Sequence, residues 1–582
     1  MRQRAPILLA LLLVLVTVAL ALLQCGAWDG TVNGDGVSYL DLARLYSHGR
    51  LSALANGYWS PLYPMLLAAV MRLTAVAGPQ PLTTLLTPEM RVVFAVNVLV
   101  MAGAAAAFGR LLIALHRSVA PAPRAVVVCR VLAASALFVW CMIRFIGATS
   151  VTPDALLATW LLLVAGELVD ATVRPPSTAR TLRIAVFLAA GYWTKAVFFP
   201  VAALMLGAYL VTTLRAVDRA AWRAHLARGL APLLLLVAPL VVVQSASQHR
   251  LSFGETGRLN YRWYVLGAPH AAADASNDPR AELATDASSG GRQAAALPLA
   301  SGTTLYRGDV AGTFPYWFDP SRFEPRDAIR VDARAQWERL AYNAHWYRVV
   351  AAPFVVLALI ALAASLARGS LSARMLLPAL PAAALIVLDA LTHVEGRLAG
   401  PPILLLLVLA LHLSSSRPPV ATAPSLGAAR APLWRRASLA AECIALLALG
   451  VLALGRSAKR VPTAATGALA AQLVSPAAEL RARGLAEGSA IGIVGSPYGH
   501  YWAHQAGVRL AVVTQTEGRN APMGDAELAA IARESCAQGA PLGAIVGHQR
   551  DDVQSRDAVA LASGWWIWRP PPTSPCTRVS TR

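Results

Sequence analysis

Apolar residues fill long, almost uninterrupted stretches over the first 455 residues of the chain, and polar residues are concentrated between these stretches. Because about 20 apolar residues in a helix are enough to cross a bilayer, this pattern predicts membrane-spanning helices. We therefore expect a polytopic α-helical membrane protein with about eleven transmembrane helices. The predicted spans are residues 5–23, 91–114, 125–145, 154–171, 183–196, 198–214, 229–246, 347–367, 373–392, 400–414 and 434–455.

The composition supports this class. The 582 residues are 56% hydrophobic and only 14% charged, whereas soluble proteins carry about 25% charged residues. The net charge of +20 is also compatible with nucleic-acid binding. However, the Lys and Arg residues lie mostly in short loops between apolar segments, where they orient a membrane protein. We therefore expect the membrane, and not nucleic acid, as a partner.

The basic loops predict the orientation of the chain. With eleven spans, the Arg-rich loops all fall on one side of the membrane, which is the cytoplasmic side by the positive-inside rule. This arrangement requires the apolar stretch 61–77 to lie along the outer face without crossing. The loops on the cytoplasmic side lie within residues 110–130, 174–183, 215–228, 368–374 and 417–436.

Four segments then lie outside the cytoplasm: 24–60, 149–154, 247–346 and 456–582. We divide the chain into a transmembrane domain, 1–455, and an extracytoplasmic α/β domain, 456–582. The first external loop with its juxtamembrane helices is 24–90, and the large external loop is 247–346. Within the large loop, Asn277 to Gly291 are expected to be mobile, and the aromatic stretch Tyr306 to Phe323 can lie on the membrane surface.

The C-terminal region has the pattern of a small α/β domain. Buried strands are predicted at 490–495, 510–513, 543–546 and 565–568, with a helix at 526–537. The glycines after the first strand do not form a dinucleotide-binding fingerprint, so we expect no nucleotide site. Cys536 and Cys576 can pair if this domain lies in an oxidising compartment.

Carboxylates gather on the predicted outer side. Asp29, Asp35 and Asp41 follow the first apolar helix, and Asp154 follows Pro153 at the start of a predicted helix. Carboxylates at a membrane face are costly to desolvate and are candidates for function. Asp29 and Asp41 are better interpreted as solvated loop or turn residues, because Asp-Gly is a common turn pair. Asp154 also fits a helix cap. Asp35 is the strongest candidate.

Two cations reach the same side. Lys195 ends the segment Gly191-Tyr192-Trp193-Thr194-Lys195, and Arg397 ends His393-Val394-Glu395-Gly396-Arg397. Each has a simpler interpretation: Lys195 as a side chain extending from a helix end to the interface, Arg397 as an orienting charge. His393 and Glu395 can pair with each other. The aromatics Tyr39, Trp59 and Tyr63 also fit an interface belt.

The order of these motifs resembles a known family. Asp35 with Ser38-Tyr39, followed by Ser60-Pro61-Leu62-Tyr63-Pro64, resembles the first external loop of the GT-C superfamily of glycosyltransferases. The protein-mannosyltransferase and aminoarabinose-transferase type is the most similar. Thr152-Pro153-Asp154-Ala155-Leu156-Leu157 is similar to that family's second acidic element, and Gly191 to Lys195 to its Gly-x-x-x-Lys segment.

The resemblance covers residues 1–215 by motif and the remainder only by architecture. Two positions depart from the family pattern. Arg397-Leu398 stands where the family has Arg-Tyr, and Ser60-Pro61 stands where it has a double Pro or His-Pro. Both departures bear on the roles of single residues rather than on the family.

The resemblance implies an inverting glycosyltransferase of the cell envelope. It would lie in the bacterial inner membrane and move a sugar from a polyprenyl-phosphate donor to an acceptor hydroxyl or similar group on the extracytoplasmic face. Asp35 would be the base, and Asp154 would position the acceptor or help to hold a divalent cation. Lys195 and Arg397 would bind the donor phosphate. The side chains expected to contact substrate are Tyr39, Tyr63, Tyr192 and Glu395. The acceptor can be a lipid, a glycan or a protein.

Two other functions remain open. A transporter or flippase of lipid-linked intermediates would need charged residues in the middle of its helices, but the interiors of the predicted spans are nearly free of charge. A non-catalytic scaffold would bind a glycan through the C-terminal domain, and Asp35 would then be dispensable.

Overall fold

The computed structural model describes most of the chain. The described residues are 4–76, 86–118, 123–214, 217–267, 295–299, 303–307, 310–324, 329–366, 376–413, 433–458, 476–514, 522–547, 553–561 and 564–571. The stretch expected to be mobile, 277–291, lies outside them, as does Cys576. Cys536 is disulfide-bonded.

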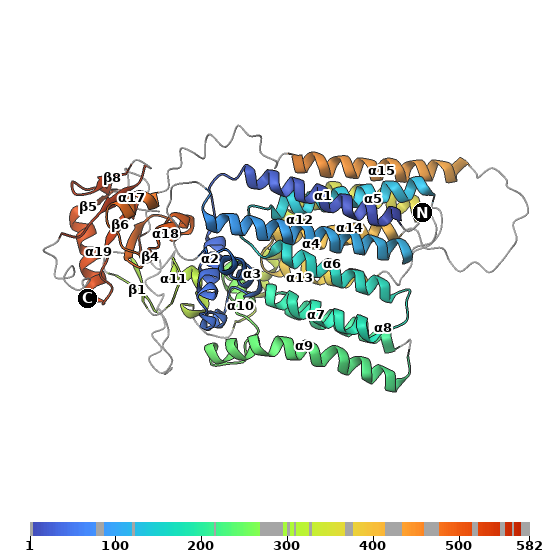
Figure 1. The fold of residues 1–582 in the computed structure, drawn as a ribbon, viewed down its shortest axis with the longest axis horizontal. Coiled ribbons are helices and arrows are strands. Elements are labelled where there is room, and N and C mark those ends of the chain that lie inside the picture. Colours follow the sequence, from blue (N-terminus) through green and yellow to red (C-terminus); the bar gives the residue numbers. More distant parts are fainter. Residues whose placement is uncertain are drawn as a thin grey trace, which may run out of the picture.

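The protein is a bundle of apolar helices with a small sheet domain at one end (Figure 1). Each of the eleven predicted spans coincides with a helix of this bundle. The helices are α1 (Arg4–Gly26), α4 (Pro88–Ser118), α5 (Arg124–Val139) with the π-helical segment Trp140–Ile146, α6 (Asp154–Ala171), α7 (Thr178–Thr194), α8 (Phe198–Leu214), α9 (Arg219–Gln248), α12 (Ala333–Leu366), α13 (Leu376–Leu391), α14 (Gly396–Leu413) and α15 (Leu433–Ala458).

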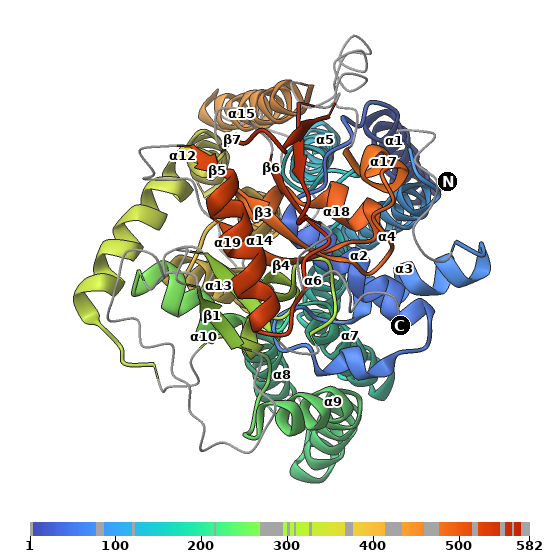
Figure 2. The ribbon, with the colours of Figure 1, turned by 90° about the vertical axis from the view of Figure 1, so that its left-hand side faces the viewer.

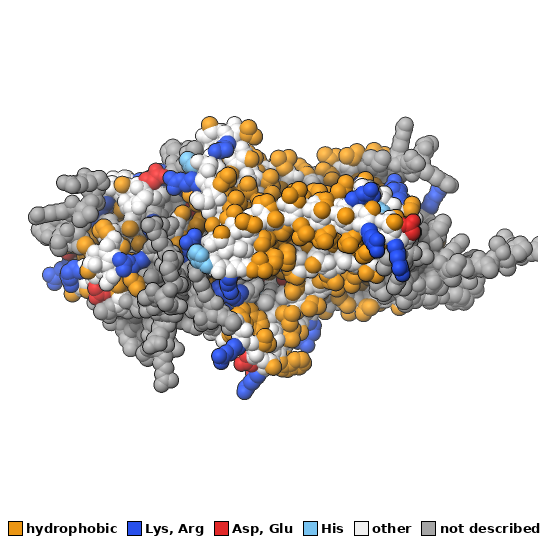
Figure 3. Space-filling view, turned by 90° about the horizontal axis from the view of Figure 1, so that it is seen from below, with side chains coloured by type: hydrophobic (Ala, Val, Ile, Leu, Met, Phe, Trp, Pro, Cys, Tyr) orange, Lys and Arg blue, Asp and Glu red, His pale blue; other side chains and the backbone are white. Residues whose placement is uncertain are grey.

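The bundle has the composition of a membrane domain. Among the described residues, five helices are long and apolar enough to cross a bilayer, and α12 makes a sixth if its two pieces, bent by 60°, count as one span. The number of spans, eleven, stays a prediction. Apolar side chains cover the flank of the bundle, and Lys and Arg gather toward its ends (Figure 3). The chain is therefore a multi-pass helical membrane protein.

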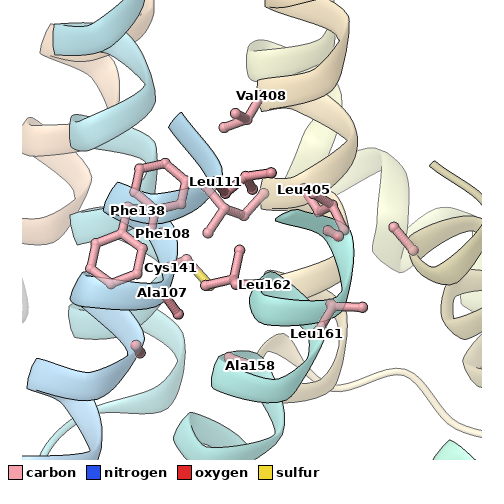
Figure 4. Packing of buried hydrophobic residues seen from close by; sticks show 14 of the residues in the cluster. Ala107, Phe108, Leu111, Phe138, Cys141, Ala158, Leu161, Leu162, Leu405 and Val408 are labelled. Carbon is pink, nitrogen blue, oxygen red and sulfur yellow. The ribbon is translucent and has the colours of Figure 1, made fainter. Parts of the chain in front are cut away.

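The interior of the bundle is filled by side chains from helices distant in the sequence (Figure 4). Phe108 of α4 and Phe138 of α5 stack with ring centroids 4.8 Å apart. Gly109 allows close approach of α1, because a Cβ there would lie 2.8 Å from that of Ala10. Small residues at helix contacts give membrane helices their packing energy, since lipid removes the hydrophobic drive to associate.

Shorter helices lie across the end of the bundle that faces the sheet. They are α2 (Gly34–Ser47), the 3-10 helix Leu51–Ala55, α3 (Leu62–Leu73), α10 (Thr256–Asn260) with the π-helical turn Tyr261–Val265, and α11 (Pro315–Phe318) with the 3-10 turn Pro320–Arg322. Helices α2 and α3 run across the bundle axis (Figures 1 and 2). With 12 residues, α3 is too short to span a bilayer. The length of α3 agrees with the prediction that the stretch 61–77 does not cross the membrane, and its position along the outer face stays a prediction.

Among the described residues, the sheet domain contains a seven-stranded sheet in the order β1-β2-β4-β3-β6-β9-β8. Strand β3 lies parallel to both β4 and β6, and its apolar residues are buried between neighbours. The predicted strands and the predicted helix α19 (Asp525–Ala537) are confirmed. The strands are β1 (Ala295–Pro298), β2 (Thr304–Arg307), β3 (Ala490–Val494), β4 (Arg509–Thr514), β6 (Ala544–Gly547), β8 (Val559–Ala560) and β9 (Trp566–Trp568). The remaining elements are α17 (Pro476–Ala482), the 3-10 turn Pro497–Gly499, α18 (Tyr501–Ala506), and the pair β5 (Met523–Gly524) and β7 (Val553–Gln554).

Two features of the large external loop differ from expectation. Strands β1 and β2, which were not predicted, join the C-terminal sheet through antiparallel pairing of β2 with β4. The aromatic stretch was expected on the membrane surface, but Tyr316, Trp317 and Phe318 are buried in an apolar cluster with α2 and the sheet domain. Burial inside the protein removes more aromatic surface from water than contact with headgroups would. This loop therefore joins the bundle to the sheet domain.

Charged clusters at the opposite end of the bundle are structural. Glu167 is fully buried near the end of α6 and accepts hydrogen bonds from Arg183 over 2.6 and 3.0 Å and from Arg110. Arg130 pairs with buried Glu442. At 1.5 Å per helical residue, Glu167 lies about 20 Å along α6 from Asp154. These ion pairs hold helices together away from the acidic residues on the sheet side.

Candidate functional site

A cavity of about 370 Å³ lies where α2, α10, α11, α14 and the α7–α8 junction meet. Its wall combines carboxylates, cations and aromatic rings. The charged and polar residues that line it are Asp35, Ser60, Lys195, Thr256, Asn260, Asp389, Thr392, His393, Glu395 and Arg397. The aromatic residues are Tyr39, Tyr58, Trp59, Phe199, Phe253, Tyr264 and Trp317. Asp35, Lys195, Glu395 and Arg397, chosen from the sequence, thus meet at one place.

Asp35 stands in the first turn of α2. Asn33 caps this helix by accepting a hydrogen bond from the Gly36 N–H over 2.9 Å, so the helix begins one residue before Asp35. A carboxylate is favoured there by the helix dipole. Asp35 Oδ2 accepts a hydrogen bond from Arg397 Nη2 over 2.5 Å, and Oδ1 accepts one from Trp317 Nε1 over 3.2 Å.

Asp154 is the first residue of α6, directly after Pro153. Its Oδ1 accepts a hydrogen bond from Lys195 Nζ over 2.6 Å, and its Oδ2 lies 3.8 Å from Arg397 Nε. Lys195 follows the last residue of α7, where a cation is favoured by the dipole of that helix. Asp154 therefore holds both cations of the site, as well as standing at a helix start.

Arg397 joins the acidic residues. It lies in the first turn of α14, and its Nε donates to Glu395 Oε2 over 2.6 Å. Burial alone would lower the pKa of Arg397, but the surrounding charges of Asp154, Asp35 and Glu395 raise it well above its usual value. The guanidinium is therefore a permanent cation contacted by three carboxylates.

His393 and Glu395 form the pair that the sequence allowed. His393 Nε2 lies 3.0 Å from Glu395 Oε1, and Arg339 Nη2 donates to His393 Nδ1 over 2.9 Å. Because the guanidinium can only donate, Nδ1 accepts and Nε2 carries the proton toward Glu395. Burial tends to raise the pKa of Glu395, but the hydrogen bond from His393 and the charge of Arg397 lower it to about 2. Glu395 is therefore an ionised residue that orients Arg397.

The structure places the three tyrosines that were predicted from the sequence in different environments. Tyr39 lines the cavity, with its ring edge-on to Trp59 at 5.1 Å. Tyr63 is buried behind Tyr39 and donates to Asn97 Oδ1 over 2.9 Å. Tyr192 instead lines an apolar groove between α7, α8 and α9. The structure therefore places only Tyr39 beside the charged cluster, and substrate contact by these tyrosines stays a prediction.

The two remaining acids of the first loop have different environments. Asp29 accepts hydrogen bonds from the N–H and the hydroxyl of Thr31, as expected for a turn residue. Asp41 was also interpreted as a solvated residue, and this is wrong. It is buried in α2 and accepts hydrogen bonds from Thr313 and His504, which come from segments far away in the sequence.

Sequence reasoning missed several residues that line the cavity, among them Trp317 and Asp389. Trp317 of α11 donates a hydrogen bond to Asp35. Because the two residues are 282 positions apart, the sequence around Asp35 contains no pattern that predicts this contact. Asp389 lies buried on α13 beside the cavity. Its signal was present, because an acid inside an otherwise apolar span is a candidate for function.

A metal site is not formed by the predicted pair. Asp35 and Asp154 both contact the guanidinium of Arg397, which takes the place that a bridging cation would need. Within the described ranges, no group of three or more His, Cys, Asp or Glu residues is arranged to hold a metal ion. The residues present therefore do not fit a divalent cation in this arrangement.

No family model matches the chain, and no curated protein matches it. Two solved structures of ArnT from Cupriavidus metallidurans align with it at 14% identity over 95% of this chain and 97% of theirs. The form bound to undecaprenyl phosphate gives a TM-score of 0.49 and the apo form 0.48. Similarity at this level assigns no function, so the function rests on the geometry of the site.

Proposed function

We propose that this protein is a membrane glycosyltransferase that takes a sugar from a polyprenyl-phosphate donor. The observation that carries the proposal is that the charged cavity and an apolar groove share a lining residue, Phe199. Phe199 lines both the cavity and a groove of about 300 Å³ between α7, α8 and α9. A ligand with an anionic head and a long hydrocarbon tail matches this pair of spaces.

The groove has the chemistry that a lipid tail requires. Apart from Tyr192, its lining is entirely apolar: Leu188, Phe199, Ala202, Ala203, Leu206, Gly207, Leu210, Leu230, Leu233, Leu234 and Val237. Leu230 and Leu234 are 40% and 55% exposed, so the groove reaches the outer surface of the helices. A tail can therefore enter from the bilayer while the head lies among the charged residues.

The cavity can hold the phosphate of the donor. Lys195 and Arg397 both line it, and the first turns of α2, α6 and α14 converge there. Helix N-termini and charge-assisted hydrogen bonds favour a phosphate group. Their carboxylate partners hold both cations in place until the phosphate competes for them. As the sugar leaves, the same cations would stabilise the charge that develops on the phosphate.

Asp35 is the better candidate for the base. Its side chain is 19% exposed and lines the cavity, whereas that of Asp154 is 1% exposed. Asp35 would take the proton of the acceptor hydroxyl as the new bond to the anomeric carbon forms. The bond from that carbon to the phosphate oxygen breaks, and its electron pair stays on the phosphate. Attack from the side opposite the phosphate inverts the anomeric centre. Asp154 would keep Lys195 and Arg397 in position.

The site is proposed to face away from the cytoplasm. The sheet domain and the cavity-lining helices α2, α10 and α11 lie at the same end of the bundle (Figure 1). The ion pairs of Glu167 with Arg110, Arg180 and Arg183 lie toward the other end of α6 from Asp154. An alkaline phosphatase fused after Arg582 is expected to be active, since that enzyme needs an oxidising compartment to form its disulfides. An inactive but stably expressed fusion would indicate the opposite orientation, with the site on the cytoplasmic side.

The function is tested by the lipid-linked intermediate that accumulates when the gene is deleted. Mass spectrometry of the lipid extract is expected to show a polyprenyl-phosphate sugar that disappears when the wild-type protein is restored. Asp35→Asn should leave the intermediate in place. Asp29→Asn is the matched control, because Asp29 lies in the same external loop and, within the part of the chain that the structure describes, accepts its hydrogen bonds from Thr31. Absence of any accumulated lipid-linked sugar, or full restoration by Asp35→Asn at equal expression, would contradict the proposal.

A further inference from the structure

A second charged cluster joins the sheet domain to α2 outside the cavity. His504 of α18 is completely buried, with Nδ1 lying 2.7 Å from Asp41 Oδ1 and Nε2 lying 3.0 Å from Glu89 Oε2. Carboxylate oxygens only accept, so both ring nitrogens carry protons and the imidazole is a cation. Burial and the charge of Arg44 lower the pKa of His504, but Glu89 and Asp41 outweigh them and raise it.

Arg44 and Thr313 complete the charged cluster around His504. Arg44 donates to both oxygens of Glu89 over 2.9 Å and to the backbone carbonyl of His504 over 3.2 Å. The N–H and hydroxyl of Thr313 donate to Asp41 over 2.6 and 3.0 Å. Two acids and two cations cancel in charge only while His504 is protonated. A neutral side chain at this position would leave one buried negative charge without compensation, which is strongly unfavourable.

The same helix carries Asp35. Asp41 and Arg44 lie in the middle and last turn of α2, whose first turn contains Asp35. The sheet domain also reaches that first turn. The carbonyl oxygen of Tyr498 would lie 3.2 Å from a Cβ on Gly34. The ring of Tyr498 packs edge-on against Trp317 at 5.1 Å, and Trp317 donates to Asp35. The sheet domain thus contacts α2 near both ends.

We propose that the sheet domain is a working part of the active site, in which His504 is a positioning residue. As an imidazolium it fixes α2 against α4, and so keeps Asp35 opposite Arg397. This inference rests on the proposed function for its kinetic consequences but not for its structural ones. It gives the C-terminal domain a role in the transfer step that does not require this domain to bind acceptor.

The kinetic test uses His504→Gln, which keeps a hydrogen-bonding side chain but removes the charge. We expect kcat to fall about tenfold with the KM for donor within about twofold, because small misplacements of a base are costly while phosphate binding is untouched. Trp502→Phe is the matched control on α18, since Trp502 packs on Trp565 inside the sheet domain. It should lower stability without this loss of kcat. Equal effects of the two substitutions on kcat would overturn the proposal.

A charge-compensating double variant distinguishes a positioning role of His504 from simple loss of folding. Asp41→Asn combined with His504→Gln returns the cluster to charge balance through the remaining Arg44–Glu89 pair. The double variant is expected to recover at least part of the kcat lost in His504→Gln. Independent, multiplicative losses would contradict a role for the imidazolium.

A measurement without substrate keeps this inference separate from the proposed function. Hydrogen–deuterium exchange of the α2 amides in full-length protein should be faster in His504→Gln than in the wild type, and unchanged in Trp502→Phe. Unaltered protection of α2 would remove the proposal even if the protein transfers sugars. Faster exchange in a protein that transfers no sugar would reject the proposed function and leave the link between the sheet domain and α2 standing.

Discussion

Arg397 donates a hydrogen bond to Asp35 across 2.5 Å, which joins the first turns of α14 and α2 between residues 362 positions apart. The guanidinium also lies 3.8 Å from Asp154. In this arrangement the proposed base is paired with a proposed phosphate ligand. Binding of an anionic head would draw the guanidinium toward the phosphate and free Asp35 to accept a proton. The proposed mechanism therefore requires this ion pair to open when the donor binds.

Replacement of Arg397 should affect the transfer step most. Arg397→Gln removes the cation that is proposed to face the leaving phosphate, and it leaves Asp35 and Glu395 without their common partner. Loss of one charge-stabilising group typically costs about 2.7–4 kcal/mol, so kcat should fall about 100-fold to 1,000-fold. Steady-state kinetics with a synthetic polyprenyl-phosphate sugar measures this loss.

The control for this variant is Arg334→Gln. Arg334 pairs with Glu338 on the exposed part of α12 and takes no part in the cavity. Its replacement should change kcat by less than about twofold, because exposed ion pairs contribute little. A similar loss in both variants would point to a general charge effect and against the role of Arg397.

Lys195 and Asp154 should behave as one unit. Lys195→Met leaves the almost fully buried carboxylate of Asp154 with only its distant contact to Arg397, so stability should fall as well as donor affinity. The double variant Lys195→Met/Asp154→Asn should be more stable than Lys195→Met alone, because the uncompensated charge is gone. It should still bind donor weakly. Thermal unfolding and donor titration give the two readouts, and additive losses of stability would contradict the coupling.

Local sequence patterns predicted those parts of the molecule that local patterns determine. Apolar runs located the bundle helices, and Pro153 marked the start of α6 at Asp154. His393, Glu395 and Arg397 are close in the sequence, so their contacts require only one turn at the start of α14. The meeting of Asp35 with Arg397 was inferred from their shared side of the membrane.

Contacts between distant segments had no such signal. Asp41 pairs with His504 across 463 positions, and nothing near Asp41 distinguishes it from a solvated turn residue. Strands β1 and β2 are short and follow a stretch rich in Ala, Asp and Ser, and their place in the sheet depends on pairing with β4. Asp389 is different, because its position in an apolar run was visible and was overlooked.

The apolar groove offers a test based on chain length. A Cβ on Gly207 would have no neighbouring atom within 4 Å, so Gly207→Leu should place its side chain in the groove without disturbing the helices. The KM for a long-chain polyprenyl donor should rise about tenfold, while a donor with a very short tail should be unaffected. Each displaced methylene contact is worth about 0.8 kcal/mol. Gly207→Ala is the control and should leave both donors unchanged. An equal rise for both tail lengths would remove the groove as the site of the tail.

The pH dependence of stability should report on the cluster between α2 and the sheet domain. Several groups face His504: Asp41 and Arg44 of α2, Glu89 of α4, Thr313, and His500, which lies four residues earlier in the chain. Burial lowers the pKa of His500 to about 4. His500 is therefore neutral throughout the relevant range.

The pKa of His504 is raised above its usual value of 6.5, against the opposing effect of burial, by Glu89 and Asp41. A group with a raised folded-state pKa contributes its full stability below its unfolded pKa and loses it as the pH rises through the folded value. The wild-type Tm should therefore fall as the pH rises above 6.5 toward and through the raised value. In His504→Gln this part of the pH dependence should be absent, so the Tm difference between the two proteins should shrink with rising pH. Thermal unfolding in detergent at a series of pH values measures this Tm difference. A Tm difference that stays constant over this range would mean that His504 does not act as a buried cation.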